Sequence, residues 1–279
     1  MKIAALTLAA LIGFAANSLL CRQALGSHHI DAASFTAIRL LSGALVLAIL
    51  AGATRAPGER LVGGSWRSAA ALFAYAAAFS YAYLRIDAGV GALILFASVQ
   101  VAMVGWGLFR GERPGRLEWV GLAVAVAGLV ALTRPGLEAP DGAGAALMAL
   151  AGASWGIYSL RGRSAGRPLA ATAGNFIRCV PAAALLAVMA SVHVSAQGAV
   201  LAILSGAIAS GIGYSLWYAA LPHLPATRAA IVQLSVPALA AAGGVALLGE
   251  SLSVRLVASG LAILGGVAIA LLGRLHRER

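Results

Sequence analysis

Long apolar stretches recur along the whole of this 279-residue chain and leave little room for anything else. Hydrophobic residues make up 61% of the sequence and charged residues only 10%. A water-soluble domain is about half apolar and about a quarter charged. The sequence therefore predicts an all-α integral membrane protein. Because one span needs about 20 apolar residues, the chain has room for roughly ten spans and for no sizeable soluble domain.

Ten apolar runs are separated by short breaks rich in Gly, Pro and Arg, which are typical of turns between helices. We expect transmembrane helices at residues 3–21, 32–52, 66–84, 89–109, 119–132, 143–160, 170–191, 198–221, 226–248 and 254–273. The first run follows a lone Lys2, as in a secretory signal peptide, but its apolar stretch is longer than the usual one. We therefore expect it to be retained as a span.

Basic residues are distributed unequally over the predicted loops of this chain, whose net charge is +11. Loops that cross the membrane during insertion are depleted of Lys and Arg. One set of alternate loops carries Lys2, Arg55, Arg60, Arg67, Arg110, Arg113, Arg116, Arg161, Arg163, Arg167, Arg228, Arg274, Arg277 and Arg279. The other set carries Arg22, Arg85, Arg134 and Arg255. This bias predicts that both termini are cytoplasmic, with basic loops next to anionic lipid and no nucleic-acid partner.

Helices five apart in this order resemble each other, which indicates a duplicated five-helix unit at residues 1–136 and 137–279. Arg39 in the second helix aligns with Arg178 in the seventh, and Phe14 aligns with Trp155. Because five is odd, the second unit must lie inverted in the membrane. Arginine content supports the inversion, since the loop after the second helix is basic and its counterpart after the seventh helix is not.

With these features, the chain resembles the EamA-type exporters of the drug/metabolite transporter superfamily. The resemblance rests on Ser154-Trp155-Gly156, the Arg39 and Arg178 positions, and Pro237 followed by Leu-Leu-Gly-Glu ending at Glu250. Within that superfamily the sequence looks like a bacterial aromatic amino-acid exporter. The resemblance implies an inner-membrane secondary transporter with two inverted five-helix repeats around a central cavity. The first half departs from it, since it has Phe14-Ala15 where many members have Trp-Gly and lacks a counterpart of Pro237.

Arg39 and Arg178 are the basic residues predicted to lie within helices, and an arginine at bilayer depth is costly. Each arginine either snorkels or caps backbone carbonyls, binds a substrate carboxylate, or makes a gating contact. All nine acidic residues, in contrast, lie in loops or at helix edges. Glu112 and Glu250 are expected to cap helices or to pair with Arg113 and Arg255. Without a carboxylate in the pathway, the sequence predicts facilitated transport with no obligatory proton coupling.

Aromatic and amide side chains recur at helical spacing in the middle of several spans and are predicted to line the substrate site, together with the two arginines. The predicted substrate-binding residues are Trp155, Tyr158, Phe79, Tyr83, Tyr214, Tyr218, Phe14, Asn17, Phe96, Gln100, Arg39 and Arg178. The same side chains would also suit helix packing or interhelical hydrogen bonds. Pro237, expected at mid-helix, is either a gate or a structural kink.

The function that the resemblance implies is export of aromatic and other neutral amino acids, or of related small metabolites, by alternating access. Export of drugs or other metabolites is the alternative within the same superfamily. An enzyme would need clustered nucleophiles, bases or metal ligands in the spans, and a channel would need a selectivity ring. No metal or cofactor is expected, because Cys21 and Cys179 lack ligand spacing. The Gly-rich last helix suits packing within a monomer or a homodimer.

Overall fold

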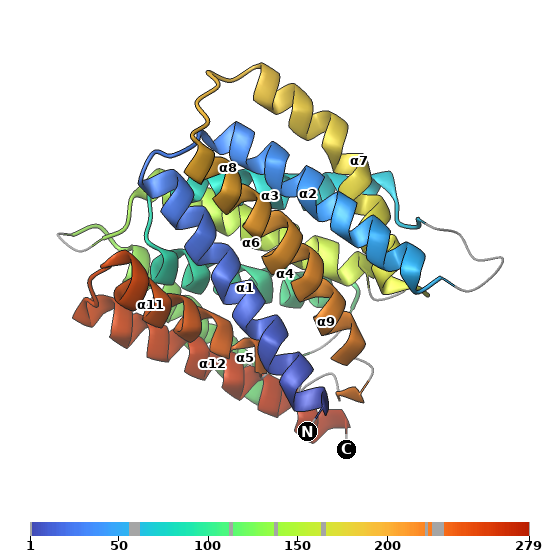
Figure 1. The fold of residues 1–279 in the computed structure, drawn as a ribbon. Helices are drawn as coiled ribbons and strands as arrows, with labels where there is room; N and C mark the ends of the chain where they lie inside the picture. The colour runs from blue at the N-terminus through green and yellow to red at the C-terminus, as the bar shows by residue number, and fades with distance from the viewer. Residues whose placement is uncertain are drawn as a thin grey trace.

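The computed structural model describes residues 2–55, 62–111, 114–136, 139–162, 166–220, 223–224 and 232–278, with side chains as far as Gly273. Apart from one antiparallel bridge between Ile30 and Val194, the regular structure of these residues is helical (Figure 1). The helices are α1 (Lys2–Gly26), α2 (Ala32–Ala53), α3 (Trp66–Tyr83), α4 (Ala88–Phe109), α5 (Arg116–Thr133), α6 (Gly142–Gly162), α7 (Pro168–Val188), α8 (Ala196–Ile203), η1 (Leu204–Ile212), α9 (Gly213–Ala220), α11 (Ser235–Leu248) and α12 (Val254–Glu278).

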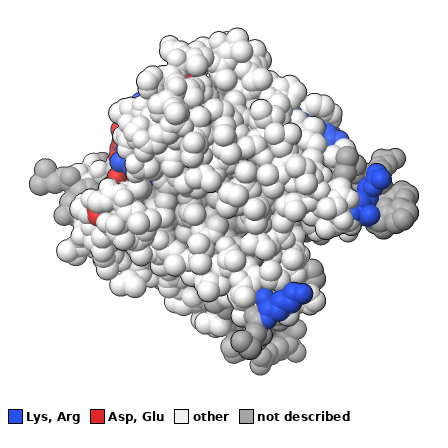
Figure 2. Space-filling model, viewed as in Figure 1, with Lys and Arg blue, Asp and Glu red and all other residues white. Residues whose placement is uncertain are grey.

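The described helices confirm the ten predicted spans, if α8, η1 and α9 are counted as one continuous span over Ala196–Ala220. Eight of the ten are long and apolar enough to cross a membrane. The remaining two are α3, which carries a stripe of tyrosine and serine side chains, and α11, which has only 14 residues. Charged side chains gather at the edges of the face in Figure 2, and the broad surface between them is uncharged. That surface suits contact with lipid.

Residues with short polar side chains directly precede three of the helices and act as N-caps. Asp31, Ser65 and Ser195 are the N-caps of α2, α3 and α8. The Asp31 carboxylate accepts a hydrogen bond from the Ser34 amide over 2.8 Å, and each serine hydroxyl accepts one from the third residue of its helix. Such caps satisfy amide groups that a helix cannot pair by itself. They fix where each span enters the membrane.

The contacts between helices repeat under exchange of the two halves. Three equivalent pairs pack directly on each other, namely α2 on α7, α4 on α11 and α5 on α12. The contact of α3 with α6 is matched by the contact of the α8–η1–α9 span with α1. Likewise, α4 on α6 is matched by α11 on α1. This pattern is that of two five-helix units related by a pseudo-two-fold axis.

Equivalent connections between helices lie at opposite ends of the molecule. The α1–α2 connection meets the α7–α8 connection through the Ile30–Val194 bridge and a bond from the Asp31 amide to the His193 carbonyl. At the other end of the α2–α7 pair, the Gly63 amide of the α2–α3 connection donates to the Ala170 carbonyl. We call these the α1–α2 end and the α6–α7 end. The second unit is therefore inverted relative to the first.

Glycines bring the last helices of the two halves, α5 and α12, into close contact. A Cβ atom added to Gly121 would collide with the backbone of Gly266 and Ala270, and one added to Gly266 would collide with the backbone of Gly121 and Ala125. Small residues let helices approach this closely in a membrane, where dispersion contacts replace the hydrophobic effect. The Gly-rich surface predicted from the sequence is thus used within the fold.

The span that follows Ser195 differs from the regular helix expected there. Its middle segment, η1, is π-helical over nine residues and packs on α1 and α2. A Cβ atom at Gly206 of η1 would collide with the Arg39 carbonyl oxygen and the Ser42 hydroxyl. π-helical turns are rare and often lie at functional sites. Here the wider turn directly precedes Tyr214.

Candidate substrate site

The centre of the fold is occupied by a continuous cluster of aromatic rings from both halves. The ring centroid of Tyr75 in α3 lies 5.3 Å from that of Phe79 and 4.9 Å from that of Trp155 in α6. Trp155 in turn stacks on Tyr214 of α9, with centroids 5.5 Å apart and 18° between the ring planes. The cluster also includes Phe14, Tyr83, Tyr158 and Phe176. The two halves thus meet through aromatic contacts.

Arg39 of α2 is enclosed by this aromatic cluster, and only 1% of its surface is exposed. Its guanidinium carbon lies 5.4 Å from the centroid of the Tyr75 ring and 5.0 Å from that of Phe79. Arg39 Nη2 donates a hydrogen bond to Tyr75 Oη over 3.2 Å. The Nε and Nη1 atoms have no hydrogen-bond partner among the described residues. The site is therefore a buried cation with aromatic walls and unused donors.

The positive charge of Arg39 is not balanced by a negative charge among the described residues. Burying a charge without a counter-charge is costly, and aromatic faces return only part of the lost hydration. None of the ion pairs among the described residues involves Arg39. A planar anion with two acceptor oxygens, such as a carboxylate, is the group that a guanidinium binds best.

Arg178 of α7 aligns with Arg39 in the repeat but lies at the α6–α7 end. Its Nη1 atom donates to the carbonyl oxygens of Gly63, at 2.6 Å, and Gly174, at 2.8 Å. Its guanidinium carbon also lies 5.9 Å from the ring centroid of Trp66. Arg178 thus caps backbone carbonyls, which is one of the roles that the sequence left open.

A layer of polar side chains lies between the aromatic cluster and the α6–α7 end. The Thr172 hydroxyl lies 3.5 Å from Tyr158 Oη and 3.3 Å from Tyr218 Oη. Asn175 Nδ2 donates to Tyr158 Oη over 3.5 Å, while its Oδ1 atom accepts from the Ser65 amide over 2.9 Å. This layer couples α6, α7 and α9 to the start of α3.

The α1–α2 end is closed by groups outside the spans. The Asp31 carboxylate accepts hydrogen bonds from the amides of Ser34 and His193. Burial alone would raise the pKa of Asp31, but these bonds and one from Ala33 hold the pKa below its usual value. Asp31 is therefore ionised at neutral pH and ties the α1–α2 connection to the α7–α8 connection.

A second set of contacts at the α1–α2 end involves Arg22, Asp87 and Glu250. Arg22 Nη2 lies 2.8 Å from Asp87 Oδ1, and Arg22 Nε lies 3.7 Å from Glu250 Oε1. Glu250 also accepts a hydrogen bond from the Ala88 amide over 2.7 Å and so caps α4. Burial raises the pKa of Glu250 above its usual value, although the bond from Ala88 opposes this rise.

Comparison with known proteins now identifies the family. Residues 1–134 and 142–272 match the EamA-like transporter family. This chain belongs to that family. An uncharacterized protein of Pseudomonas aeruginosa, PA1977, is 54% identical over 274 residues, covering 98% of this chain and 95% of that protein. The threonine/homoserine exporter RhtA of Escherichia coli K12 is 39% identical over 167 residues, about half of each chain.

A solved crystal structure matches this EamA-family fold with a TM-score of 0.68 and 22% sequence identity. The match covers 96% of this chain and 97% of that one, and it supports the ten-helix fold alone. Family membership confirms that the protein is a multi-pass membrane transporter of a small-molecule substrate and not an enzyme. The finer resemblance to an aromatic amino-acid exporter stays a prediction.

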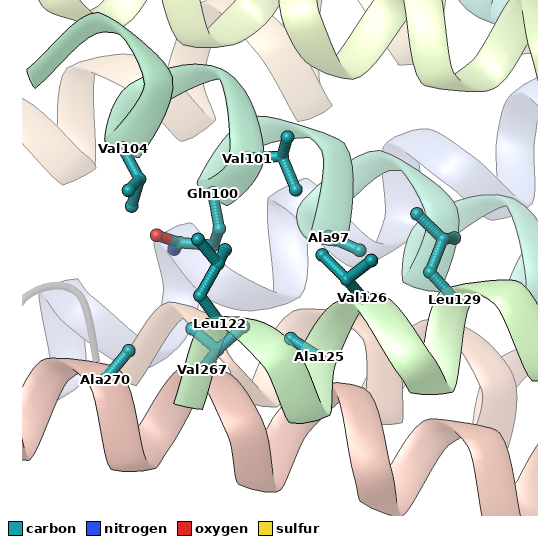
Figure 3. A pocket seen from close by; sticks show the side chains of 10 residues that line it. All are labelled: Ala97, Gln100, Val101, Val104, Leu122, Ala125, Val126, Leu129, Val267 and Ala270. Carbon is teal, nitrogen blue, oxygen red and sulfur yellow. The ribbon is translucent and has the colours of Figure 1, made fainter. Parts of the chain in front are cut away.

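Within this EamA-family fold, the predicted site residues do not all lie together. The structure brings together eight of them in or beside the central cluster: Phe14, Arg39, Phe79, Tyr83, Trp155, Tyr158, Tyr214 and Tyr218. Asn17 of α1 accepts a hydrogen bond from Ser205 of η1. Arg178 lies apart at the α6–α7 end. Phe96 packs at the edge of the cluster, while Gln100 lines a small apolar pocket between α4, α5 and α12 (Figure 3). Gln100 is therefore not part of the central cluster.

Two expectations about the second half need correction. Pro237 lies in the first turn of α11, and a turn at Leu234 separates this helix from the helical residues 232–233, so Pro237 follows a break in the helix and does not lie within a continuous one. Glu250 pairs with Arg22 and caps α4, whereas Arg255 donates to the Arg134 carbonyl. Of the two roles expected for Glu250, helix capping is confirmed, at α4, and pairing with Arg255 is wrong. The predicted pairing of Glu112 with Arg113 lies outside the described residues, as do the basic loop residues Arg60, Arg163 and Arg228 and the side chains of Arg274, Arg277 and Arg279.

Sequence reasoning missed several residues that complete the site. Tyr75 holds Arg39, and it was detectable because it begins the stripe of α3 that continues with Phe79 and Tyr83. Trp217 packs on Phe14, and Thr172 joins Tyr158 to Tyr218. No spacing rule points to these two. Among the described residues, no three His, Cys, Asp or Glu side chains are grouped to hold a metal ion.

Proposed function

We propose that this EamA-family protein exports neutral amino acids across the bacterial inner membrane by alternating access between its two halves. The observation that carries the proposal is Arg39, a buried cation with two unpartnered nitrogen atoms inside an aromatic enclosure. A substrate carboxylate would supply the missing charge and acceptors. The rings of Trp155 and Tyr214 would contact the apolar part of the substrate.

The relatives favour the same chemical class of substrate. RhtA carries a name for export of threonine and homoserine, both of which are neutral amino acids with an α-carboxylate. The aromatic enclosure favours larger side chains such as those of tryptophan and phenylalanine. All of these substrates share the carboxylate that Arg39 would bind. Export of drugs or other metabolites remains the alternative within the family.

The proposal also includes the orientation of the protein in the membrane and the driving force for transport. The basic residues favour a cytoplasmic position for the α6–α7 end and for both termini, and α1 begins on the same side of the molecule where α12 ends (Figure 1). Among the described residues, acidic side chains lie in connections or in the first turn of helices. Transport is therefore proposed to be facilitated, driven by the outward gradient of the amino acid itself.

Counterflow in liposomes tests the function. Purified protein should exchange labelled threonine, phenylalanine or tryptophan for the same unlabelled amino acid, and an imposed pH gradient alone should not drive accumulation. Absence of exchange with every neutral amino acid would overturn the proposal. Accumulation driven by a pH gradient would overturn only its facilitated character.

Cysteine labelling tests the orientation. Arg67 and Arg85 are exposed and lie at the α6–α7 end and the α1–α2 end, while the native Cys21 and Cys179 are buried. In intact cells an impermeant thiol reagent should label Arg85→Cys but not Arg67→Cys. The reverse pattern would contradict the proposed topology.

A further inference from the structure

A cavity of about 500 Å³ opens at the α6–α7 end, apart from the central cluster. It lies where α6 ends and where α3 and α7 begin. The volume falls within the range of small-molecule sites, about 300 to 1,000 Å³. Its lining is strongly polar and includes Ser65, Ser68, Asn175 and the side chains of three arginines, Arg161, Arg167 and Arg178. This composition differs from the aromatic centre of the fold.

The charged side chains that line the cavity are all basic, as far as the structure describes the chain. None of the described residues that line it is acidic. Two of the arginines are held in place, since Arg178 donates to the Gly63 and Gly174 carbonyls and Arg161 Nε donates to the Ser68 hydroxyl over 3.1 Å. Both of these arrangements keep the positive charge, because the acceptors are neutral. The starts of α3 and α7 add the partial positive charge of two helix N-termini.

The opposite end of the molecule has a different charge balance. There, Arg22 contacts Asp87 and Glu250, and Arg85 lies 3.6 Å from Asp141. The general excess of basic residues on one side of a membrane protein does not require that they converge on a cavity. In this protein, three arginines line the same cavity. The cavity is therefore suited to attract and hold an anionic group.

The cavity also lies next to the central site. Its lining includes Tyr158, which is buried and whose ring centroid lies 5.4 Å from that of Trp155. Trp155 packs on Tyr75, and Tyr75 accepts the hydrogen bond from Arg39. A layer of packed aromatic rings therefore separates the arginines of the cavity from Arg39. The polar layer of Thr172 and Asn175 lies beside these rings, so a group held in the cavity would reach Arg39 only after both layers moved.

We propose that this cavity is a loading site that holds the carboxylate of an amino-acid substrate before it passes the Tyr158–Trp155 layer to Arg39. The inference rests on the proposed function and extends it to a second site. A zwitterionic amino acid would place its carboxylate among the arginines and its ammonium group toward solvent. Amino acids with a cationic side chain, such as lysine, would be repelled. The phosphate of an anionic lipid headgroup has the same chemistry, and the experiment must distinguish it from a free substrate.

The test uses the double variant Arg161→Gln/Arg167→Gln, which removes two charges and leaves the carbonyl cap made by Arg178. The KM for threonine should rise about three- to tenfold with kcat unchanged, because a charged cleft mainly concentrates its ligand. Lysine should compete better in this variant than in the wild-type protein. Arg85→Gln, which removes an exposed arginine at the opposite end, is the matched control and should leave KM unchanged.

Two further arms make the result decisive. Arg161→Lys/Arg167→Lys keeps the charge and should restore a KM close to that of the wild-type protein, which excludes misfolding as the cause. All variants are measured in liposomes with and without anionic lipid. A rise in KM in both bilayers supports the loading site. A rise only with anionic lipid assigns the cavity to a headgroup and overturns it, as does an unchanged KM in both. Wild-type protein that carries no amino acid would instead refute the proposed function.

Discussion

Arg39 and Arg178 occupy equivalent positions in the two halves of the molecule and have opposite surroundings. Arg39 is buried among aromatic rings and has two nitrogen atoms without a partner. Arg178 lies at the α6–α7 end, where Nη1 donates to two backbone carbonyls. The duplicated helix positions therefore do not carry duplicated chemistry. One arginine keeps two donor atoms without a partner among the described residues, while the other ties α7 to the α2–α3 connection.

The residue four positions before each arginine in its helix accounts for the difference between the surroundings of Arg39 and Arg178. A long side chain on a helix points back over that residue. Before Arg178 it is Gly174, whose carbonyl accepts a hydrogen bond from the arginine and whose lack of a Cβ atom lets the Gly63 backbone approach. Before Arg39 it is Phe35, which is fully buried. A single glycine in one half thus decides which arginine is satisfied by the backbone.

The strongest test of the comparison is removal of the available arginine. Arg39→Met should lower counterflow of neutral amino acids at least about a hundredfold, because losing one partner of a buried charge pair costs about 3 kcal/mol or more. The melting temperature should stay equal or rise, since the variant removes an unpaired buried charge. Counterflow and thermal melting in the same detergent check both effects. Near-normal transport would show that Arg39 binds no substrate.

Gly174→Ala should disturb the contacts of Arg178 and leave the central aromatic cluster unchanged. The added methyl group would collide with the Gly63 carbonyl oxygen, and overpacking of this kind costs about 1 to 3 kcal/mol. We expect a lower melting temperature with the relative rates for different amino acids unchanged. Gly265→Ala is the matched control, because nothing lies within 4 Å of its added Cβ atom. Equal melting of the two variants would show that the contact carries no stability.

Arg178→Gln should show whether Arg178 stabilises the fold or binds substrate. It removes two charge-assisted hydrogen bonds to carbonyl oxygens, each worth about 1.5 to 3 kcal/mol where the groups are desolvated and less where Arg178 meets solvent. Thermal stability should fall, and transport at saturating substrate should persist. A loss of transport as deep as that of Arg39→Met, at unchanged stability, would mean that the two arginines act alike.

The smallest expected effect concerns selectivity within the aromatic cluster. Trp155→Ala should weaken transport of tryptophan and phenylalanine more than that of threonine and alanine, because one ring contact is worth about 0.5 to 1.5 kcal/mol beyond its area. Tyr218→Ala, whose hydroxyl bonds to Thr172, should change the four substrates more evenly. Uptake of the four amino acids measures the ratio. A uniform loss in Trp155→Ala would leave the ring with a packing role only.

The sequence predicted the parts of this fold that depend on local properties. Span length, hydropathy and the turn residues between apolar runs are read within one segment, and the ten helices followed from them. The aromatic stripe of α3 likewise places Phe79 and Tyr83 on one face. These features need no knowledge of the partner helix.

What depended on contacts between distant segments could not be predicted. The partner of Arg178 is the carbonyl of Gly63, in a connection more than a hundred residues away. Glu250 was expected to bond near its own position and instead reaches α4 and Arg22.

The π-helical segment gives the span that carries Tyr214 a rotational freedom that α3 lacks. In η1 the backbone bonds close a wider turn than in an α-helix. One residue of an α-helix corresponds to about 100° of turn, so a change of η1 to α-helical bonding would rotate Tyr214 about the helix axis by an angle of that order. Phe79, the counterpart of Tyr214 in the regular helix α3, has no such movement open to it. Such a change of bonding would turn the ring stacked on Trp155 and leave the ring beside Arg39 in place, so the two halves need not move equivalently about their pseudo-two-fold axis.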